Sequence, residues 1–109
     1  MADIKYSQAA FNDLEDIGDY ISMDLKNPTA AHNTVSRIID TIEKLEASPY
    51  LGSQLSSRYE NAGNYRYLVC GNYLVFYRYE EPVVFIDRIL YGKRNHLSIL
   101  FGEVSEDEE

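Results

Sequence analysis

Apolar residues recur at helical spacing in the first part of the chain. Positions three or four residues apart predict one buried stripe on a helix of about 20 residues. This stripe consists of Phe11, Leu14, Ile17, Ile21 and Leu25. Ser7 precedes it and is a suitable N-cap. Asn27 and Pro28 should then begin a second helix, because asparagine caps helices and proline suits their first turn.

The second helix has its own apolar stripe, which Pro49 and Gly52 should bring to an end. Its members are Ala31, Val35, Ile38, Ile39, Ile42 and Leu45. Two long amphipathic helices with a short break between them are typical of an antiparallel helical hairpin.

Strand-like segments flank this helical pair. The predicted strands are residues 2–6, 65–70, 73–79 and 83–91. Residues 53–64 are polar without a period and predict a loop. The Gly71-Asn72 pair is typical of a two-residue hairpin turn, and residues 80–82 predict a second turn. The order βααβββ predicts an α+β fold, in which the N-terminal helical hairpin packs on one face of an antiparallel sheet.

Strict alternation through these two turns divides the strand residues between two faces of the sheet. One face should carry Arg66, Leu68, Cys70, Tyr73, Val75, Tyr77, Phe85, Asp87, Ile89 and Tyr91. The other should carry Tyr65, Tyr67, Val69, Leu74, Phe76, Arg78, Val84, Ile86, Arg88 and Leu90. Both faces are largely apolar and two helices cover only one, so the uncovered face should bind a partner. Arg66 and Asp87 share a face, where they either form an ion pair or contact a target.

Composition indicates one globular domain. The chain has 109 residues, of which 45% are hydrophobic and 26% charged, and this balance excludes a disordered protein. Cys70 is the single cysteine and cannot form an intrachain disulfide. Asp3 and Lys5 interrupt any signal-peptide pattern, and the apolar runs are too short to span a bilayer. We therefore expect a cytoplasmic protein that has no contact with a membrane.

Charge is unevenly distributed along the chain. The net charge of −8 and the pI of about 4.6 argue against a free-standing nucleic-acid binder. Only residues 65–101 carry more cations than anions. Residues 102–109 are strongly acidic and predict a disordered tail behind a domain of residues 1–101.

Motifs for metal or cofactor chemistry are missing from the sequence. His32, Cys70 and His96 lack the spacing of metal ligands. Gly92-Lys93 lacks the other residues of a phosphate-binding loop. We therefore expect neither a metal nor a cofactor.

The pattern as a whole resembles the RelE/ParE superfamily of bacterial toxins. The resemblance runs over residues 3–101 and rests on "YRYLVCGNYLVFYRYEEPVVFIDRILYGKRN", which follows a strand and a helical pair ending in "LEASPYLGSQL". The most specific parts are "NYLVFY" and "RILYGKRN", and the members most alike are of the ParE or plasmid-stabilisation type. The resemblance implies a toxin of a type II toxin–antitoxin module, which a cognate antitoxin binds and inhibits. An oligomer that contains both proteins is one form that it suggests.

Two kinds of activity occur in that superfamily. ParE-like members poison DNA gyrase, whereas RelE-like members cut mRNA on the ribosome without a metal. Cleavage requires a base, an acid and cations around the phosphate. If this chain is a nuclease, the resemblance implies catalytic roles for Arg94, Lys93, His96 and Arg66.

The sequence departs from the cleaving members at several positions. Leu74 replaces a basic residue of the middle strand, and Leu100-Phe101 replace a C-terminal tyrosine. Fewer cations at a phosphate site should lower the rate of cleavage by several powers of ten. We therefore favour a ParE-like poison of gyrase. An mRNA endonuclease and a non-toxic remnant that only binds an antitoxin are the alternatives. The residues predicted to bind a partner are Tyr91, Arg88, Leu74, Phe76 and Arg78.

Overall fold

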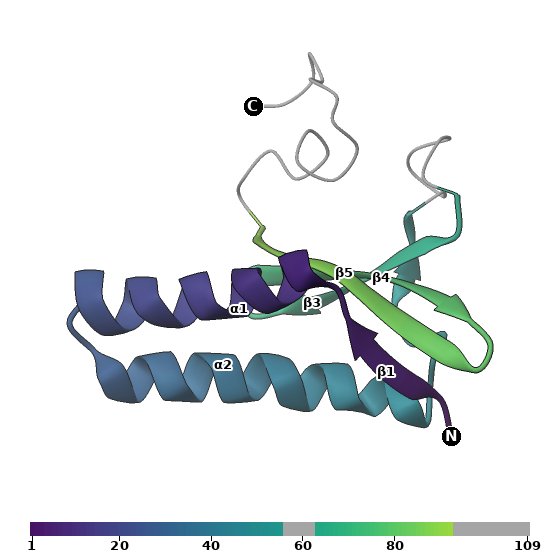
Figure 1. Ribbon diagram of the computed structural model, residues 1–109, viewed down its shortest axis with the longest axis horizontal. Coiled ribbons are helices and arrows are strands. Elements are labelled where there is room, and N and C mark those ends of the chain that lie inside the picture. The colour runs from purple at the N-terminus through teal and green to yellow at the C-terminus, as the bar shows by residue number, and fades with distance from the viewer. Residues whose placement is uncertain (56–62, 93–109) are drawn as a thin grey trace, which may run out of the picture.

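The computed structural model describes residues 1–55 and 63–92, which contain two long helices and a five-stranded sheet (Figure 1). The helical elements are α1 (Gln8–Asp19), the π-helical turn η1 (Tyr20–Asp24), α2 (Pro28–Glu43) and the 3-10 turn η2 (Lys44–Glu46). The strands are β1 (Asp3–Tyr6), β2 (Ser53–Gln54), β3 (Tyr65–Cys70), β4 (Tyr73–Glu80) and β5 (Val83–Tyr91). The predicted α+β order is confirmed, with the short strand β2 added in a segment predicted to be loop. The predicted tail of residues 102–109 lies outside the described residues.

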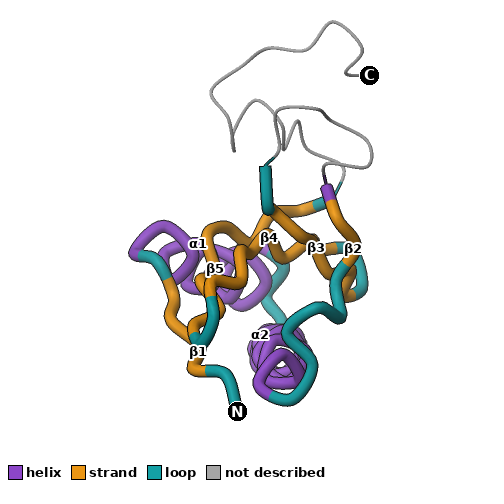
Figure 2. Tube along the Cα trace, turned by 90° about the vertical axis from the view of Figure 1, so that its right-hand side faces the viewer, coloured by secondary structure: helices purple, strands orange, loops and turns teal. Residues whose placement is uncertain are grey.

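The sheet is mixed, whereas the sequence predicted a purely antiparallel one. Its strand order is β1-β5-β4-β3-β2, and β1 runs parallel to β5 while the other neighbours are antiparallel. Turn residues predict which consecutive strands pair, but β1 is separated from β5 by most of the chain. The helical hairpin packs against the sheet, with α1 against β5 and α2 reaching β3 (Figure 2). No helix among the described residues is long and apolar enough to cross a membrane.

A β-bulge in β5 changes the predicted faces of the sheet. Phe76 pairs with Arg88 but Tyr77 pairs with Ile86, so Asp87 is an extra residue without a direct partner. One inserted residue reverses the alternation on its far side. Val84 and Ile86, which strict alternation groups with Leu74 and Phe76, therefore lie on the other face and are fully buried under the helices. Phe85 and Asp87 were likewise assigned to the wrong face, whereas the assignment of residues 88–91 is correct.

Side-chain caps begin both helices as predicted. The Ser7 Oγ accepts a hydrogen bond from the Ala10 N–H at 2.9 Å. The Asn27 Oδ1 accepts one from the Ala30 N–H at 3.0 Å, and Pro28 is the first residue of α2. Each cap satisfies a backbone donor that the helix itself leaves unpaired.

The main core lies between the helical hairpin and the sheet. Its fully buried side chains include Ile38, Ile42, Leu45, Val75, Tyr77, Val84, Ile86 and Ile89. Of the predicted stripe on the first helix, Leu14 and Ile21 are buried, but Phe11 and Leu25 are exposed. The buried row begins at Ala10, which turns Phe11 to the side. Leu25 lies beyond the last turn that α2 covers.

Gly18 offers a simple test of helix packing in α1. A Cβ built at Gly18 lies 3.5 Å from the Val35 Cγ2, which is an ordinary contact. Alanine restricts the unfolded chain more than glycine and is the better helix former. Gly18→Ala should therefore raise the free energy of unfolding by about 0.5–1 kcal/mol, measured by urea denaturation. A loss of stability would show that α1 and α2 pack too closely for one methyl group.

Candidate functional site

The β5 bulge is fixed to α1 by a charged hydrogen-bond cluster. The Arg88 Nε and Nη2 donate to the two carboxylate oxygens of Asp13 at 2.8 and 2.9 Å. The Ile89 backbone N–H donates to the same carboxylate at 2.9 Å. The Asp13 side chain is only 11% exposed, and its hydrogen bond raises the pKa of Arg88. Arg88, a predicted binding residue, therefore holds helix and strand together.

The N-terminus of α1 also contacts the bulge. The Ser7 backbone N–H donates to the Ile86 carbonyl at 2.9 Å, and the Ser7 Oγ donates to the Asp87 carbonyl at 2.8 Å. The same hydroxyl caps α1. Ser7, just before α1, and Asp13, in its second turn, therefore both bind the irregular part of β5. These two contacts fix the backbone on either side of Arg88.

Asp87 forms the centre of a second charged cluster, on the sheet face away from the main core. The Arg78 Nε donates to the Asp87 Oδ2 at 2.8 Å, and its Nη1 donates to the Glu80 Oε2 at 2.9 Å. The guanidinium lies 5.0 Å from the centre of the Phe85 ring. The hydrogen bond to Asp87 raises the pKa of Arg78. The pKa of the Tyr65 hydroxyl is also raised, mainly by burial and secondly by the negative charge of Asp87. Two carboxylates thus surround one arginine here.

Arg66 lies on the opposite face and has different partners. Its Nη1 donates to the Gly52 carbonyl at 2.8 Å, and its guanidinium lies 4.8 Å from the centre of the Tyr50 ring. Of the two alternatives for Arg66 and Asp87, an ion pair between them is wrong, because the bulge turns Asp87 towards Arg78. Contact with a target stays a prediction. Arg66 instead fastens the loop that follows α2 to the sheet.

The three strand arginines therefore do not form one cationic site. Arg66 binds loop carbonyls, Arg78 binds two carboxylates, and Arg88 binds Asp13 on α1. Arg78 and Arg88 are already neutralised by carboxylates, whereas the carbonyl partners of Arg66 leave its positive charge uncompensated. The remaining cationic residues predicted for the site, Lys93, Arg94 and His96, lie outside the described residues.

The predicted apolar binding residues fall on both sides of the sheet. Phe76 is 1% exposed and packs with Leu90 and Leu55 in a second apolar cluster, which Leu74 borders. Tyr91 points to the opposite side, where its ring meets Tyr73 edge-on at a centroid distance of 5.7 Å. A binding role for Leu74, Phe76 and Tyr91 stays a prediction, since burial of Phe76 also serves the fold.

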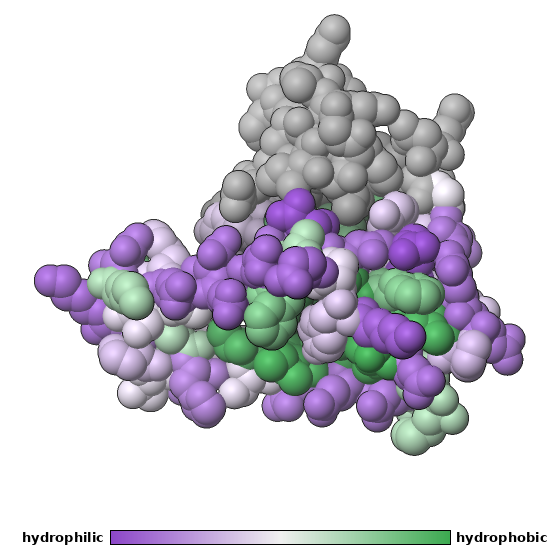
Figure 3. Space-filling view, in the orientation of Figure 1, coloured by the Kyte–Doolittle hydropathy of each residue, from purple (hydrophilic) through white to green (hydrophobic). Residues whose placement is uncertain are grey.

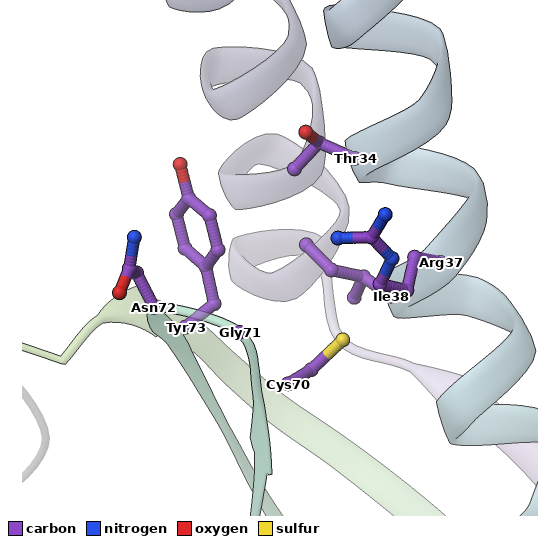
Figure 4. Close-up of a pocket in the computed structure, with 7 residues that line it drawn as sticks. All are labelled: Thr34, Arg37, Ile38, Cys70, Gly71, Asn72 and Tyr73. Atoms are coloured by element: carbon purple, nitrogen blue, oxygen red, sulfur yellow. The ribbon is translucent and has the colours of Figure 1, made fainter.

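A small cavity between α2 and the β3–β4 turn was not predicted from the sequence (Figure 4). Thr34, Arg37 and Ile38 line it from α2, and residues 70–73 line it from the turn. The Cys70 sulfur is buried beside the Thr41 hydroxyl at 3.5 Å. Sequence patterns could not reveal this cavity, because its two walls are distant in the chain.

The helical hairpin on a mixed sheet is the fold of RelE/ParE-like toxins, and the comparisons identify the family. The chain belongs to the family described as the ParE toxin of type II toxin–antitoxin systems, parDE, whose model matches residues 4–96. No curated protein matches the sequence significantly.

Solved structures show the same fold. The chromosomal ParDE toxin–antitoxin system from P. aeruginosa is similar with a TM-score of 0.70 at 22% identity. That match covers 84% of this chain and 96% of the other. The toxin–antitoxin complex RelBE2 from Mycobacterium tuberculosis is similar with a TM-score of 0.62 at 16% identity, covering 83% and 96% of the two chains.

Proposed function

We propose that this ParE-family toxin acts by binding and poisoning DNA gyrase, and that a cognate antitoxin inhibits it. The observation that carries the proposal is the pairing of Arg78 and Arg88 with carboxylates inside the protein. Poisoning a protein target requires a complementary surface, whereas RNA cleavage requires cations that are free to stabilise a phosphorane.

Electrostatics around Arg78 also favour a protein target. Its ion pairs with Asp87 and Glu80 leave one more negative than positive charge at this place on the sheet. An RNA phosphate approaching this cluster would be repelled, and freeing the arginine would leave Asp87 without its partner. Among the cations predicted for cleavage, Arg66 would then be the one within the described residues, and the others would have to come from outside them.

The antitoxin partner follows from the family and from the two structural relatives, each of which is a toxin–antitoxin system or complex. The exposed Val69 provides apolar area for such a partner on the sheet face that also carries Leu74, whereas the partly exposed Tyr91 lies on the opposite face. Binding of an antitoxin to the folded chain alone should raise its melting temperature.

The direct experiment induces the chain in bacterial cells and follows plasmid supercoiling and mRNA integrity together. Growth arrest with loss of supercoiling and intact mRNA supports the proposal. Arrest with cut mRNA favours the RelE-like alternative. An absence of arrest would identify a remnant that only binds its antitoxin.

Arg66 distinguishes the two mechanisms at the residue level. Arg66→Gln removes a cation that the nuclease alternative uses, so a nuclease should lose most of its activity. A gyrase poison should keep its activity, and the lost hydrogen bond to Gly52 should lower the free energy of unfolding by about 1 kcal/mol. Growth assays and urea denaturation of the same variant measure both effects. A stable Arg66→Gln variant without toxicity would contradict the proposal.

A further inference from the structure

The free end of the helical hairpin carries exposed apolar side chains. Tyr20, Met23 and Leu25 are 54%, 67% and 56% exposed, and we call them the hairpin tip. This end of the hairpin projects beyond the sheet (Figure 1), and pale green apolar surface lies there among purple hydrophilic residues (Figure 3). Neighbouring apolar residues exposed at the end of a projecting element are typical of a binding surface.

Packing of the hairpin does not require these three side chains. In η1 only Ile21 is buried, and it completes the core row of α1. The Leu25 N–H reaches back to the Tyr20 carbonyl at 3.1 Å, and Lys26 then reverses the chain with a φ of 55°. η1 packs against α2, but the side chains of Met23 and Leu25 remain more than half exposed beside that contact. η1, which continues α1, is a π-helical turn, and such turns are frequent at functional sites.

Acidic residues lie along the last turns of α1 and in η1, on one side of the hairpin tip. Residues 15–27 contain Glu15, Asp16, Asp19 and Asp24, and Lys26 is their single cation. All four carboxylate residues are exposed. An apolar centre with an acidic rim is complementary to an apolar pocket with lysines and arginines around it. Two copies of this chain would bring like charges together, so the rim argues against self-association through the tip.

We propose that the hairpin tip is the surface through which the toxin docks on its target, in an apolar pocket that has a basic rim. This inference rests on the proposed function, because an enzyme that handles DNA must carry basic surfaces. Tyr20 and Met23 supply the residue types that interfaces favour, and Leu25 extends the apolar contact. The acidic rim accelerates and orients the encounter, and the apolar centre holds the complex.

A matched pair of variants tests the inference. Leu25→Lys places a charge in the apolar centre and also weakens the acidic rim. Leu51→Lys makes the same change on the loop after α2, at a leucine that is 51% exposed. Leu25→Lys should reduce growth arrest and binding to purified gyrase about tenfold or more, as loss of an interface anchor does. Leu51→Lys should match the parent, and both variants should keep the parent's melting temperature.

The outcomes separate this inference from the proposed function. If Leu25→Lys arrests growth as strongly as the parent, the tip is not the docking surface, whatever the supercoiling assay gives. If the parent arrests growth without affecting gyrase and Leu25→Lys does not arrest it, the gyrase proposal fails and the tip remains the docking surface. Complex formation should also weaken as salt is raised, because the rim acts through charge. Binding that does not depend on salt would overturn the role of the acidic rim.

Discussion

Asp13→Ala should lower the free energy of unfolding by about 2–4 kcal/mol, because it leaves three N–H donors in a partly buried place without their acceptor. The Arg88 guanidinium loses both carboxylate oxygens, and the Ile89 N–H loses its hydrogen bond. The Arg88 side chain is 26% exposed, so water relieves part of the cost. Urea denaturation followed by circular dichroism measures the difference.

Two further variants separate the charge from the hydrogen bonds. Asp13→Asn keeps an oxygen for the Ile89 N–H and should cost less than Asp13→Ala. Asp13→Leu combined with Arg88→Met removes both charges, and it should be more stable than Asp13→Leu alone. If Asp13→Ala unfolds at the same urea concentration as the parent, the cluster does not hold α1 to the bulge.

Local signals in the sequence predict the regular part of this fold well. Ser7 and Asn27 are short polar side chains directly before apolar periodic segments, and both cap their helices. The Gly71-Asn72 turn sets the register of β3 against β4, and Gly71 adopts a φ of 61°, which glycine reaches without strain. These features depend on residues close together in the chain, so a pattern can predict them.

The bulge and the parallel strand depend on contacts between distant residues. Asp87 is one charged residue within an apolar strand, and alternation alone placed it beside Arg66. Its true position is determined by Ser7 and Asp13, which lie more than 70 residues away in the chain. An arginine and an aspartate adjacent in a buried strand do signal that partners exist, but the sequence does not identify them.

For the candidate site, too, the sequence predicted which residue types matter but not which distant residues they contact. The family resemblance correctly indicated a RelE/ParE-type chain. The catalytic residues predicted with it were Arg66 on a strand and Lys93, Arg94 and His96 after the last strand. The sequence could not show that Arg78 and Arg88 are held by Asp87 and Asp13. The exposed hairpin tip could not be predicted from the apolar pattern either. Leu25 fits the helical period of the buried stripe, but it lies at the free end of the hairpin and is exposed.

Gly52→Ala should be about as damaging as the loss of Asp13, for a steric reason. A Cβ at this position would lie 2.6 Å from the Tyr67 carbonyl oxygen and 2.8 Å from the hydroxyl oxygen of Tyr77. The first contact is with backbone in the sheet, so it cannot be relieved by turning a side chain. Overpacking of this kind should lower the free energy of unfolding by about 3 kcal/mol, which urea denaturation measures.

The collision would also disturb a buried hydrogen-bond chain. The Gly52 N–H donates to the Tyr77 hydroxyl at 2.8 Å, and that hydroxyl donates to the Pro49 carbonyl at 2.9 Å. Tyr77→Phe removes the hydroxyl but not the ring, and it should cost about 1–2 kcal/mol. Gly18→Ala is the matched control, since the same added methyl group makes only an ordinary contact with Val35 there and should stabilise the chain. If Gly52→Ala were as harmless as Gly18→Ala, the loop after α2 would have to move away from β3 and β4, and Arg66 would lose its carbonyl partner with it.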